Sequence, residues 1–132
     1  MRELWDFEGV WQVARSIDDA RSGQQGGFDG TARFERDGEG LHYLEQGVME
    51  LGGTKFQAER RYLWRTDDAG IAVFFDDGRP FHTINDTSTA AHWCDPDQYD
   101  VTYDFDSWPV WTAQWRVQGP RKDYVMVTTY RR

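Results

Sequence analysis

Two consecutive glycines, Gly52 and Gly53, separate two runs of alternating apolar and polar residues, 41–51 and 54–64. Glycine takes positive φ angles without steric cost, so a glycine pair between two such runs predicts a two-residue β-hairpin turn. A turn of that length leaves one register for the two strands, whose side chains alternate between the faces of the sheet. These glycines therefore constrain which residues of the two runs lie opposite each other.

In this register, Tyr43 lies opposite Tyr62 and Glu45 lies opposite Arg60. Both pairs share the face that carries most of the apolar residues of the two runs. A carboxylate and a guanidinium on the core side of a sheet are costly unless they pair with each other or handle a ligand. Two interpretations follow: Glu45 and Arg60 bind or position a polar ligand, or they form a buried structural ion pair.

Alternation of the same period recurs along the chain, most clearly at residues 28–35, 99–105 and 111–117. It is typical of strands with one dry face and one wet face. Residues that favour turns, mainly Gly, Asp, Asn and Pro, separate these runs. Helical periodicity is absent, and only residues 1–7 and 18–21 could form a helical turn.

The connections between runs have hairpin length, which predicts roughly ten short antiparallel strands. An unbroken up-and-down order favours closure into a barrel, because closure removes exposed sheet edges. We therefore expect an all-β protein, a single antiparallel up-and-down β-barrel with little helix. The length of 132 residues fits one domain, residues 1–132.

The other turns extend the expected register around the barrel. We place turns at four further segments: Asp37-Gly38, the four residues 67–70, Asp77-Gly78 and Gly119-Pro120. Moving the first turn to Gly38-Glu39 would keep each side chain on the same face of the sheet but would change which residues lie opposite each other. The expected pairs are Gly30 with Glu45, Arg60 with Phe75, Val73 with His82, and Trp115 with Tyr124. Gly30 marks either a bend in its strand or space for a ligand. A four-residue turn at 95–98 places His92 inside, whereas an odd loop length would place Trp93 inside.

The predicted interior combines aromatic walls with several polar groups, which is the usual composition of a small-molecule site. Arg15 joins this face because it alternates with Trp11 and Val13 on the first strand. The candidate ligand-binding residues are Arg15, Tyr43, Glu45, Arg60, Tyr62, His82, His92, Tyr99, Tyr103, Trp115 and Tyr124.

Charge and cysteine content narrow the partners and the compartment. The formal net charge of −8 and a sequence pI of about 4.7 disfavour nucleic acid and anionic membranes as partners. Two arginines against one glutamate make the predicted interior net positive, which favours an anionic ligand. Cys94 is the single cysteine, so no intrachain disulfide can form, and the start of the chain has no apolar leader segment. We expect a cytoplasmic protein.

The residues Gly9-Val10-Trp11 near the start and the arginines at the end resemble the lipocalin and calycin pattern. In that pattern, the tryptophan packs under the barrel floor against a basic residue of the last strand. The resemblance implies a structural contact of Trp11 with Arg131, or alternatively with Arg132. Secreted lipocalins have a secretion signal and a disulfide, and fatty-acid-binding proteins have a helical lid between the first two strands. This sequence shows none of these features, so we do not expect the ligands of those proteins to apply directly to this chain.

Over its whole length the chain also resembles a bacterial and fungal lipocalin-like family of unknown function. Three stretches carry that resemblance, residues 77–82, 92–99 and 119–124. The resemblance implies the fold and no activity.

Metal and cofactor chemistry has little support in the sequence. His82, His92, Cys94, Asp95 and Asp97 are metal-ligating residue types, but their spacing matches no standard zinc pattern. A haem would need one of the two histidines on its iron, and no specific motif accompanies them. We expect no metal and no cofactor.

Three functional hypotheses remain. The first is a barrel that binds a small, partly apolar, anionic molecule. The second is an enzyme, such as an isomerase, lyase or hydrolase, that uses His82 or His92 with Glu45 as acid and base. The third is a structural or interaction module whose polar interior is a satisfied network. The sequence does not fix the oligomeric state.

Overall fold

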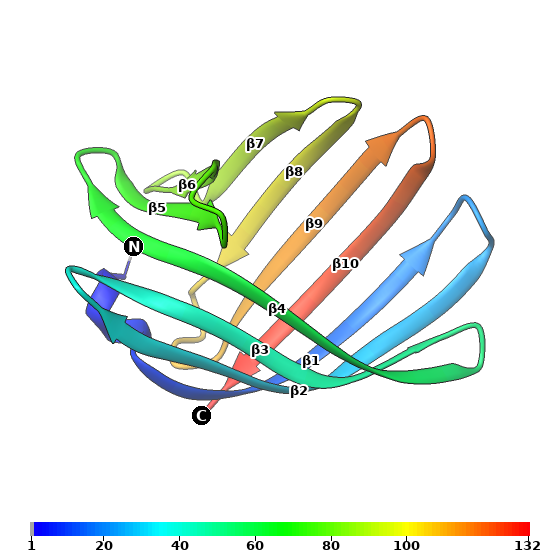
Figure 1. Ribbon diagram of the computed structural model, residues 1–132, viewed down its shortest axis with the longest axis horizontal. Helices are drawn as coiled ribbons and strands as arrows, with labels where there is room; N and C mark the ends of the chain where they lie inside the picture. Colours follow the sequence, from blue (N-terminus) through cyan, green and yellow to red (C-terminus); the bar gives the residue numbers. More distant parts are fainter. Residues whose placement is uncertain (1) are drawn as a thin grey trace.

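A computed structural model describes residues 2–132 as one antiparallel sheet rolled into a nearly closed barrel (Figure 1). Strands make up 73% of the chain and helix 3%, which confirms the all-β prediction. The elements are η1 (Leu4–Phe7), β1 (Gly9–Asp19), β2 (Gln24–Asp37), β3 (Gly40–Leu51), β4 (Thr54–Asp67), β5 (Gly70–Phe75), β6 (Pro80–Ile84), β7 (Thr89–Cys94), β8 (Asp97–Asp104), β9 (Trp111–Gly119) and β10 (Lys122–Arg131).

The strand order in the sheet is β6-β5-β4-β3-β2-β1-β10-β9-β8-β7. Consecutive strands are neighbours throughout, and the pairing of β1 with β10 joins the two ends of the chain. The two edge strands, β6 and β7, follow each other in the chain but are not paired in the described part of the molecule. The barrel is therefore an up-and-down meander with one seam. No helix of the described chain is long and apolar enough to cross a membrane.

The hairpin at Gly52 and Gly53 has the predicted register. Both glycines have positive φ, +60° and +83°, as a two-residue turn of two glycines requires. Tyr43 pairs with Tyr62, and Glu45 pairs with Arg60. The predicted pair of Val73 with His82 is also confirmed.

Three other predicted registers were wrong, and in each the paired residue lies two positions further along. At β2–β3 and β9–β10 the reason is a turn that lies one residue later. β2 and β3 join at Gly38-Glu39, where only the glycine has positive φ, and Ala32 rather than Gly30 lies opposite Glu45. β4 and β5 join at Asp68-Ala69, the middle of the predicted turn, where the Asp67 carboxylate accepts hydrogen bonds from the backbone N–H groups of Ala69 and Gly70. A turn centred there pairs Phe75 with Tyr62, so the expected pair of Arg60 with Phe75 was miscounted from a correctly placed turn.

The third slip is at the β9–β10 turn. It centres on Pro120-Arg121, since proline favours the first central position of a turn, and Trp115 lies opposite Met126 rather than Tyr124. In these strands the observed partner of each residue lies two positions from the predicted partner. Because side chains alternate with a period of two, such a shift keeps every side chain on its predicted face. The inside and outside of the barrel were therefore predicted correctly even where the pairs were not.

The histidine alternative on β7 is resolved by a two-residue turn at Asp95-Pro96. His92 pairs with Tyr99 and is half-buried, whereas the side chain of Trp93 is 60% exposed on the outer face. The expected four-residue turn at 95–98 was too long, but its even length gave the correct face.

One end of the barrel is closed by the N-terminal turn η1, which lies beside the β2–β3 and β4–β5 turns (Figure 1). Leu4 and Phe7 are both buried there, and the Phe7 ring packs within about 5–6 Å of several aromatic rings of the barrel. A helical turn in this region was predicted from residues 1–7, of which Met1 lies outside the described residues. The role of η1 as a plug was not predicted.

The floor contact of Trp11 is made by Arg132, not by Arg131. The Arg132 guanidinium carbon lies 4.0 Å from the centre of the Trp11 ring, and its nitrogens donate to the backbone carbonyl oxygens of Glu8 and Asp6, both at 2.7 Å. Arg131 is exposed and pairs through its backbone with Gln12. Strand alternation puts neighbouring residues on opposite faces, so only one of the two arginines can reach the ring.

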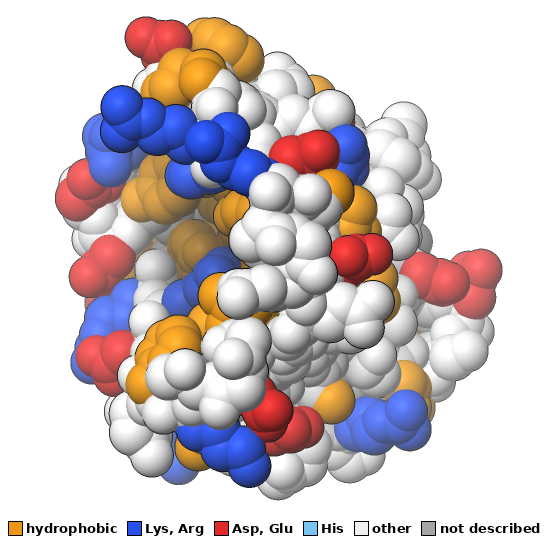
Figure 2. All heavy atoms as spheres, turned by 90° about the vertical axis from the view of Figure 1, so that its right-hand side faces the viewer, with side chains coloured by type: hydrophobic (Ala, Val, Ile, Leu, Met, Phe, Trp, Pro, Cys, Tyr) orange, Lys and Arg blue, Asp and Glu red, His pale blue; other side chains and the backbone are white. Residues whose placement is uncertain are grey.

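The opposite end of the barrel carries the β1–β2, β3–β4, β7–β8 and β9–β10 hairpins (Figure 1). Figure 2 views the molecule from this end and shows a hollow with hydrophobic side chains on its walls and a basic side chain inside it. The interior is therefore plugged at one end and open at the other.

Candidate functional site

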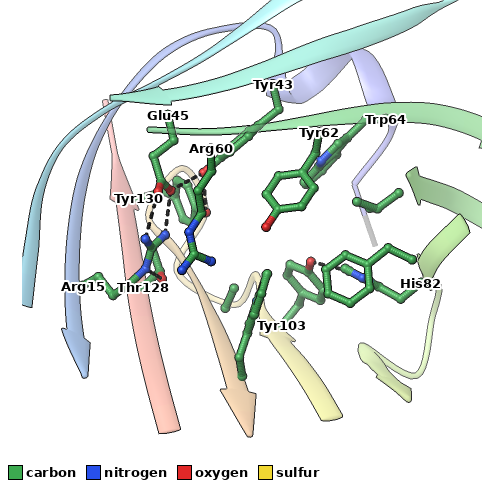
Figure 3. Close-up of a pocket in the computed structure, with 14 residues that line it drawn as sticks. Arg15, Tyr43, Glu45, Arg60, Tyr62, Trp64, His82, Tyr103, Thr128 and Tyr130 are labelled. Atoms are coloured by element: carbon green, nitrogen blue, oxygen red, sulfur yellow. Dashed lines mark hydrogen bonds and ion pairs between the residues drawn. The ribbon is translucent and has the colours of Figure 1, made fainter. Parts of the chain in front are cut away.

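A cavity lies in the middle of the barrel, between walls that are far apart in the sheet (Figure 3). The unoccupied space between its lining side chains is about 410 Å³ including the part open to solvent, but only about 30 Å³ of it can hold the centre of a water molecule. Apolar and aromatic residues form much of the wall: Trp64, Val73, Phe81, Ala113 and Trp115.

Most of the predicted site residues line this cavity. They come from β1, β3, β4, β6, β8 and β9, so the barrel brings together residues that are distant in sequence. Those that line it are Arg15, Tyr43, Glu45, Arg60, Tyr62, His82, Tyr103 and Trp115.

Arg15, rather than Arg60, holds the Glu45 carboxylate. The two terminal nitrogens of Arg15 donate to the two carboxylate oxygens of Glu45 at 2.6 and 2.8 Å, and both side chains are buried. Arg60 faces Glu45 in the register as predicted, but makes no ion pair with it. The predicted Glu45–Arg60 ion pair is therefore corrected to Arg15–Glu45.

Small residues on β2 allow Arg15 to reach across that strand. β2 lies between β1 and β3: Phe28 pairs with Arg15, Ala32 pairs with Glu45, and Gly30 lies between these two positions on the same face. A Cβ at Gly30 would collide with the backbone of Gln46 and Gly47. Gly30 is thus required by close approach of two strands, which favours the bend interpretation over space for a ligand.

Three hydroxyl groups, those of Tyr43, Tyr130 and Thr128, complete the environment of the Arg15–Glu45 pair. Tyr43 donates to Glu45 Oε1 at 2.6 Å, and the Tyr43 and Tyr130 hydroxyls lie 3.0 Å apart. Arg15 Nε donates to Thr128 Oγ1 at 2.7 Å. Because the carboxylate and the guanidinium are satisfied by fixed partners, the network fits a preorganised structural unit.

Charge and burial oppose each other in this network. Burial pushes the pKa of the Glu45 carboxyl upward, but the hydrogen bonds and charge of Arg15, followed by the Tyr43 hydroxyl, bring it below its usual value. Burial alone would lower the pKa of Arg15, but the hydrogen bonds and charge of Glu45 outweigh burial and raise the pKa of Arg15 above its usual value. Burial raises the pKa of Tyr43 well above its usual value and that of Tyr130 to about 12. The ion pair is charged and both phenols are neutral at physiological pH.

Arg60 is the cavity's remaining charged side chain. It is half-buried, points into the cavity, and its guanidinium carbon lies 5.6 Å from the centre of the Trp115 ring (Figure 3). Within residues 2–132, no carboxylate lies within ion-pair distance of it. An arginine side chain carries its charge at any physiological pH, so the cavity presents one positive charge that no protein group neutralises.

His82 and Tyr103 form a second polar contact on the far wall. His82 Nε2 and the Tyr103 hydroxyl are 2.7 Å apart. Burial, with a smaller contribution from His92, lowers the pKa of His82 to about 3, and burial raises the pKa of Tyr103 well above its usual value. Both groups are therefore neutral, and His82 is a poor base.

Three predicted residues, His92, Tyr99 and Tyr124, are not part of the cavity lining and lie toward the hairpin end of the barrel. His92 and Tyr99 pair with each other near the β7–β8 hairpin, and Tyr124 pairs with Val117 near the β9–β10 hairpin. All three are half-buried. Lys122 Nζ lies 3.5 Å from the Tyr99 hydroxyl and 2.9 Å from the Asp97 carboxylate.

Thr128 and Tyr130 line the cavity and were missed from the sequence. The signal was present, because both continue the inward alternation of Tyr124 and Met126 along β10.

The polar clusters elsewhere do not suggest a metal site. In the portion of the chain that the structure describes, no group of three or more His, Cys, Asp or Glu side chains is arranged to hold a metal ion. Cys94 is a free, half-buried thiol.

Comparison with known proteins gives a family without an assigned activity. No curated protein and no solved structure matches the chain. Residues 7–132, which include every cavity residue described above, match a family described only as a family of unknown function. The chain belongs to that family, DUF6314.

Proposed function

We propose that the barrel binds a small monoanion, such as a short carboxylate, in its central cavity, with Arg60 as the charge partner. The observation that carries the proposal is the Arg60 guanidinium, which points into the cavity and has no ion-pair partner among the described residues (Figure 3). The Arg15 and Glu45 charges in the same cavity neutralise each other. Guanidinium groups bind carboxylates through two parallel hydrogen bonds, so Arg60 suits such a ligand.

The charge of the cavity favours a monoanion over a dianion. Arg15 and Glu45 neutralise each other, and His82 and the buried tyrosines are neutral. One positive charge remains, on Arg60. A dianion would leave an unmatched negative charge in a partly buried space, which is costly.

The size of the cavity limits the ligand to a molecule well below drug size. A pocket for a drug-sized molecule has a volume of roughly 300–1,000 Å³, far above the 30 Å³ open here to the centre of a water molecule. A long-chain fatty acid is too large for this conformation. The apolar part of the expected ligand is correspondingly short and packs against Phe81 and Trp115.

The ligand reaches the cavity from the hairpin end of the barrel. That end is hollowed, and the opposite end is filled by η1 (Figures 1 and 2). The surrounding surface is acidic overall, with a formal net charge of −8 for the chain. The positive charge inside the cavity attracts a small anion that enters, whereas the acidic exterior repels long polyanions that cannot enter.

The barrel and the contact of Trp11 with Arg132 support the further proposal that this family is lipocalin-like. A carrier or sensor of a small metabolite in a reducing compartment, such as the cytoplasm, fits the single free thiol. The enzyme hypothesis, with His82 or His92 and Glu45 as acid and base, is weaker. His82, with a pKa near 3, is a poor general base at neutral pH, His92 is not part of the cavity lining, and Glu45 is paired with Arg15.

A titration followed by ¹H–¹⁵N NMR tests the proposal, since it detects weak binding of small ligands. Acetate, propanoate and sulfate are added to the wild type, to Arg60→Gln and to Arg61→Gln. Arg61 is the matched control, because it is the next residue of β4 and points to the exposed outer face. We expect acetate and propanoate to bind the wild type and Arg61→Gln more tightly than sulfate does, and Arg60→Gln to lose at least about tenfold in affinity.

Two results would reject the proposal. One is the absence of saturable shifts for both carboxylates in the wild type. The other is equal affinity of the wild type and Arg60→Gln while Arg60→Gln keeps its fold.

A further inference from the structure

His82 and Tyr103 share a single hydrogen-bond contact deep in the barrel. Their side chains approach within 2.7 Å, between His82 Nε2 and the Tyr103 hydroxyl, and the residues are 8% and 6% exposed. Both residues line the cavity, from β6 and β8. The contact can hold only one of the two hydrogen atoms that the pair carries, one on the neutral imidazole and one on the phenol.

The hydrogen can be arranged in two ways. In the first, Tyr103 donates to Nε2, and the imidazole hydrogen sits on Nδ1. In the second, Nε2–H donates to the Tyr103 oxygen, Nδ1 is a bare acceptor, and the Tyr103 hydrogen is free to turn toward the cavity. The hydrogen-bond partners of His82 Nδ1 and of the cavity side of the Tyr103 hydroxyl decide which arrangement is present.

His82 Nδ1 has no hydrogen-bond partner among the described residues and is buried. The first arrangement therefore leaves a buried N–H group unsatisfied, which is rare in folded proteins. The second arrangement leaves Nδ1 as an unpaired acceptor and depends on an acceptor in the cavity for the Tyr103 hydroxyl. An acceptor in the cavity thus favours the second arrangement.

Arg60 and Tyr103 approach the cavity from opposite walls (Figure 3). They belong to β4 and β8, which are not neighbours in the sheet. A ligand held by Arg60 at one end can therefore meet the Tyr103 hydroxyl at the other. Trp115 and Phe81 supply an apolar boundary between these polar ends.

We propose that the ligand is a short carboxylic acid with a second hydrogen-bond acceptor, such as an oxo acid, and that the Tyr103 hydroxyl donates to that second group. This inference rests on the proposed function, because Arg60 holds the carboxylate. His82 is a positioning residue: as the Nε2–H form it donates to the Tyr103 oxygen and turns the hydroxyl hydrogen toward the ligand.

The first test compares two matched pairs of acids, propanoate with pyruvate and pentanoate with 4-oxopentanoate. Each pair differs by a ketone, and the two pairs place it at different distances from the carboxylate. One good hydrogen bond predicts that at least one oxo acid binds the wild type about threefold to tenfold more tightly than its partner. Equal affinities within both pairs would overturn the inference while leaving the Arg60 proposal intact.

The second test reads the histidine form directly. Long-range ¹H–¹⁵N correlations of the His82 ring distinguish Nδ1–H from Nε2–H, and His82 can be assigned against His82→Gln. We expect the Nε2–H form in the protein saturated with the tighter oxo acid. An Nδ1–H form in that complex would overturn the inference, because Tyr103 would then donate to His82.

Variants separate recognition from structure. Tyr103→Phe removes only the hydroxyl and is expected to abolish the preference for the oxo acid over its matched partner. His82→Gln keeps an N–H group near the Nε2 position and is expected to retain the preference, whereas His82→Phe is expected to lose it. Retention of the full preference in Tyr103→Phe would overturn the inference. If none of the four acids binds the wild type, the proposed function itself fails.

Discussion

Arg15 and Glu45 form a two-point ion pair across an intervening strand. The four atoms meet at 2.6 and 2.8 Å, and the two side chains are only 4% and 1% exposed. Arg15 comes from β1 and Glu45 from β3, so the pair ties two strands that are not hydrogen-bonded neighbours. It also neutralises the charge of Glu45, so Arg60 has no ion-pair partner among residues 2–132.

Glu45→Gln is expected to destabilise the protein strongly. The variant leaves the Arg15 charge buried with no carboxylate, and breaking a buried ion pair in this way costs about 3–5 kcal/mol. The measurement is the free energy of unfolding in urea at pH 7. Glu59→Gln is the control, because Glu59 is exposed and lies 3.8 Å from Arg61, and its loss is expected to stay below about 1 kcal/mol. Similar losses in the two variants would contradict the structural role of Arg15–Glu45.

His82 is expected to make the stability depend on pH in the acid range. Its pKa in the folded state, about 3, lies below the ordinary value of 6.5, so the unfolded chain binds an additional proton between these values. The stabilisation by neutral His82 is complete above about pH 6.5 and is lost as the pH falls toward 3. Its contribution is about 1.4 kcal/mol per pH unit in that window.

This dependence can be measured as a difference, since many carboxylates titrate in the same range. Urea unfolding of the wild type and of His82→Phe is compared at pH 7, 6 and 5. The wild type should lose more stability than the variant as the pH falls from 6 to 5, by about 1 kcal/mol. Parallel curves for the two proteins would show that His82 is not held neutral by burial.

The fold was largely predictable because strand alternation and turn chemistry are local signals. The two glycines at 52 and 53 allow only one turn placement, and the register they predict was confirmed. Turns such as Asp37-Gly38 allow a placement one residue later, where Gly38 still supplies the positive φ. The slip preserved the face of every side chain, so the cavity's residues were mostly predicted even where their partners were not.

The partner of Glu45 could not be read from strand pairing. Arg15 reaches Glu45 across β2, and such a contact depends on barrel curvature and on the small inward residues Gly30 and Ala32. Pairing predicts only adjacent strands, which is why Arg60 was expected instead. The size of the cavity was also beyond prediction, because it depends on how far side chains such as Trp115 reach into the barrel.

Arg132→Gln is expected to lower the free energy of unfolding by about 2 kcal/mol. The side chain stacks on Trp11 and donates to two backbone carbonyl groups that precede β1, so its loss removes a cation–π contact and two charged hydrogen bonds. Arg131→Gln removes the same charge from an exposed neighbour and is expected to change stability by less than about 0.5 kcal/mol. The comparison in urea at one pH tests which arginine holds the floor. A larger effect of Arg131→Gln would contradict the structure.

Phe7→Ala is expected to unplug the closed end of the barrel. The ring is fully buried and lies 5.1–5.2 Å from the rings of Trp64, Trp108 and Trp111, so truncation leaves a cavity among aromatic side chains. Phenylalanine-to-alanine changes at such sites cost about 3–5 kcal/mol. Trp5→Ala serves as the control, because Trp5 belongs to the same turn but is 39% exposed, and a loss below about 1 kcal/mol is expected. Equal losses in urea unfolding would mean that η1 does not act as a plug, since its buried face would then contribute no more than its exposed one.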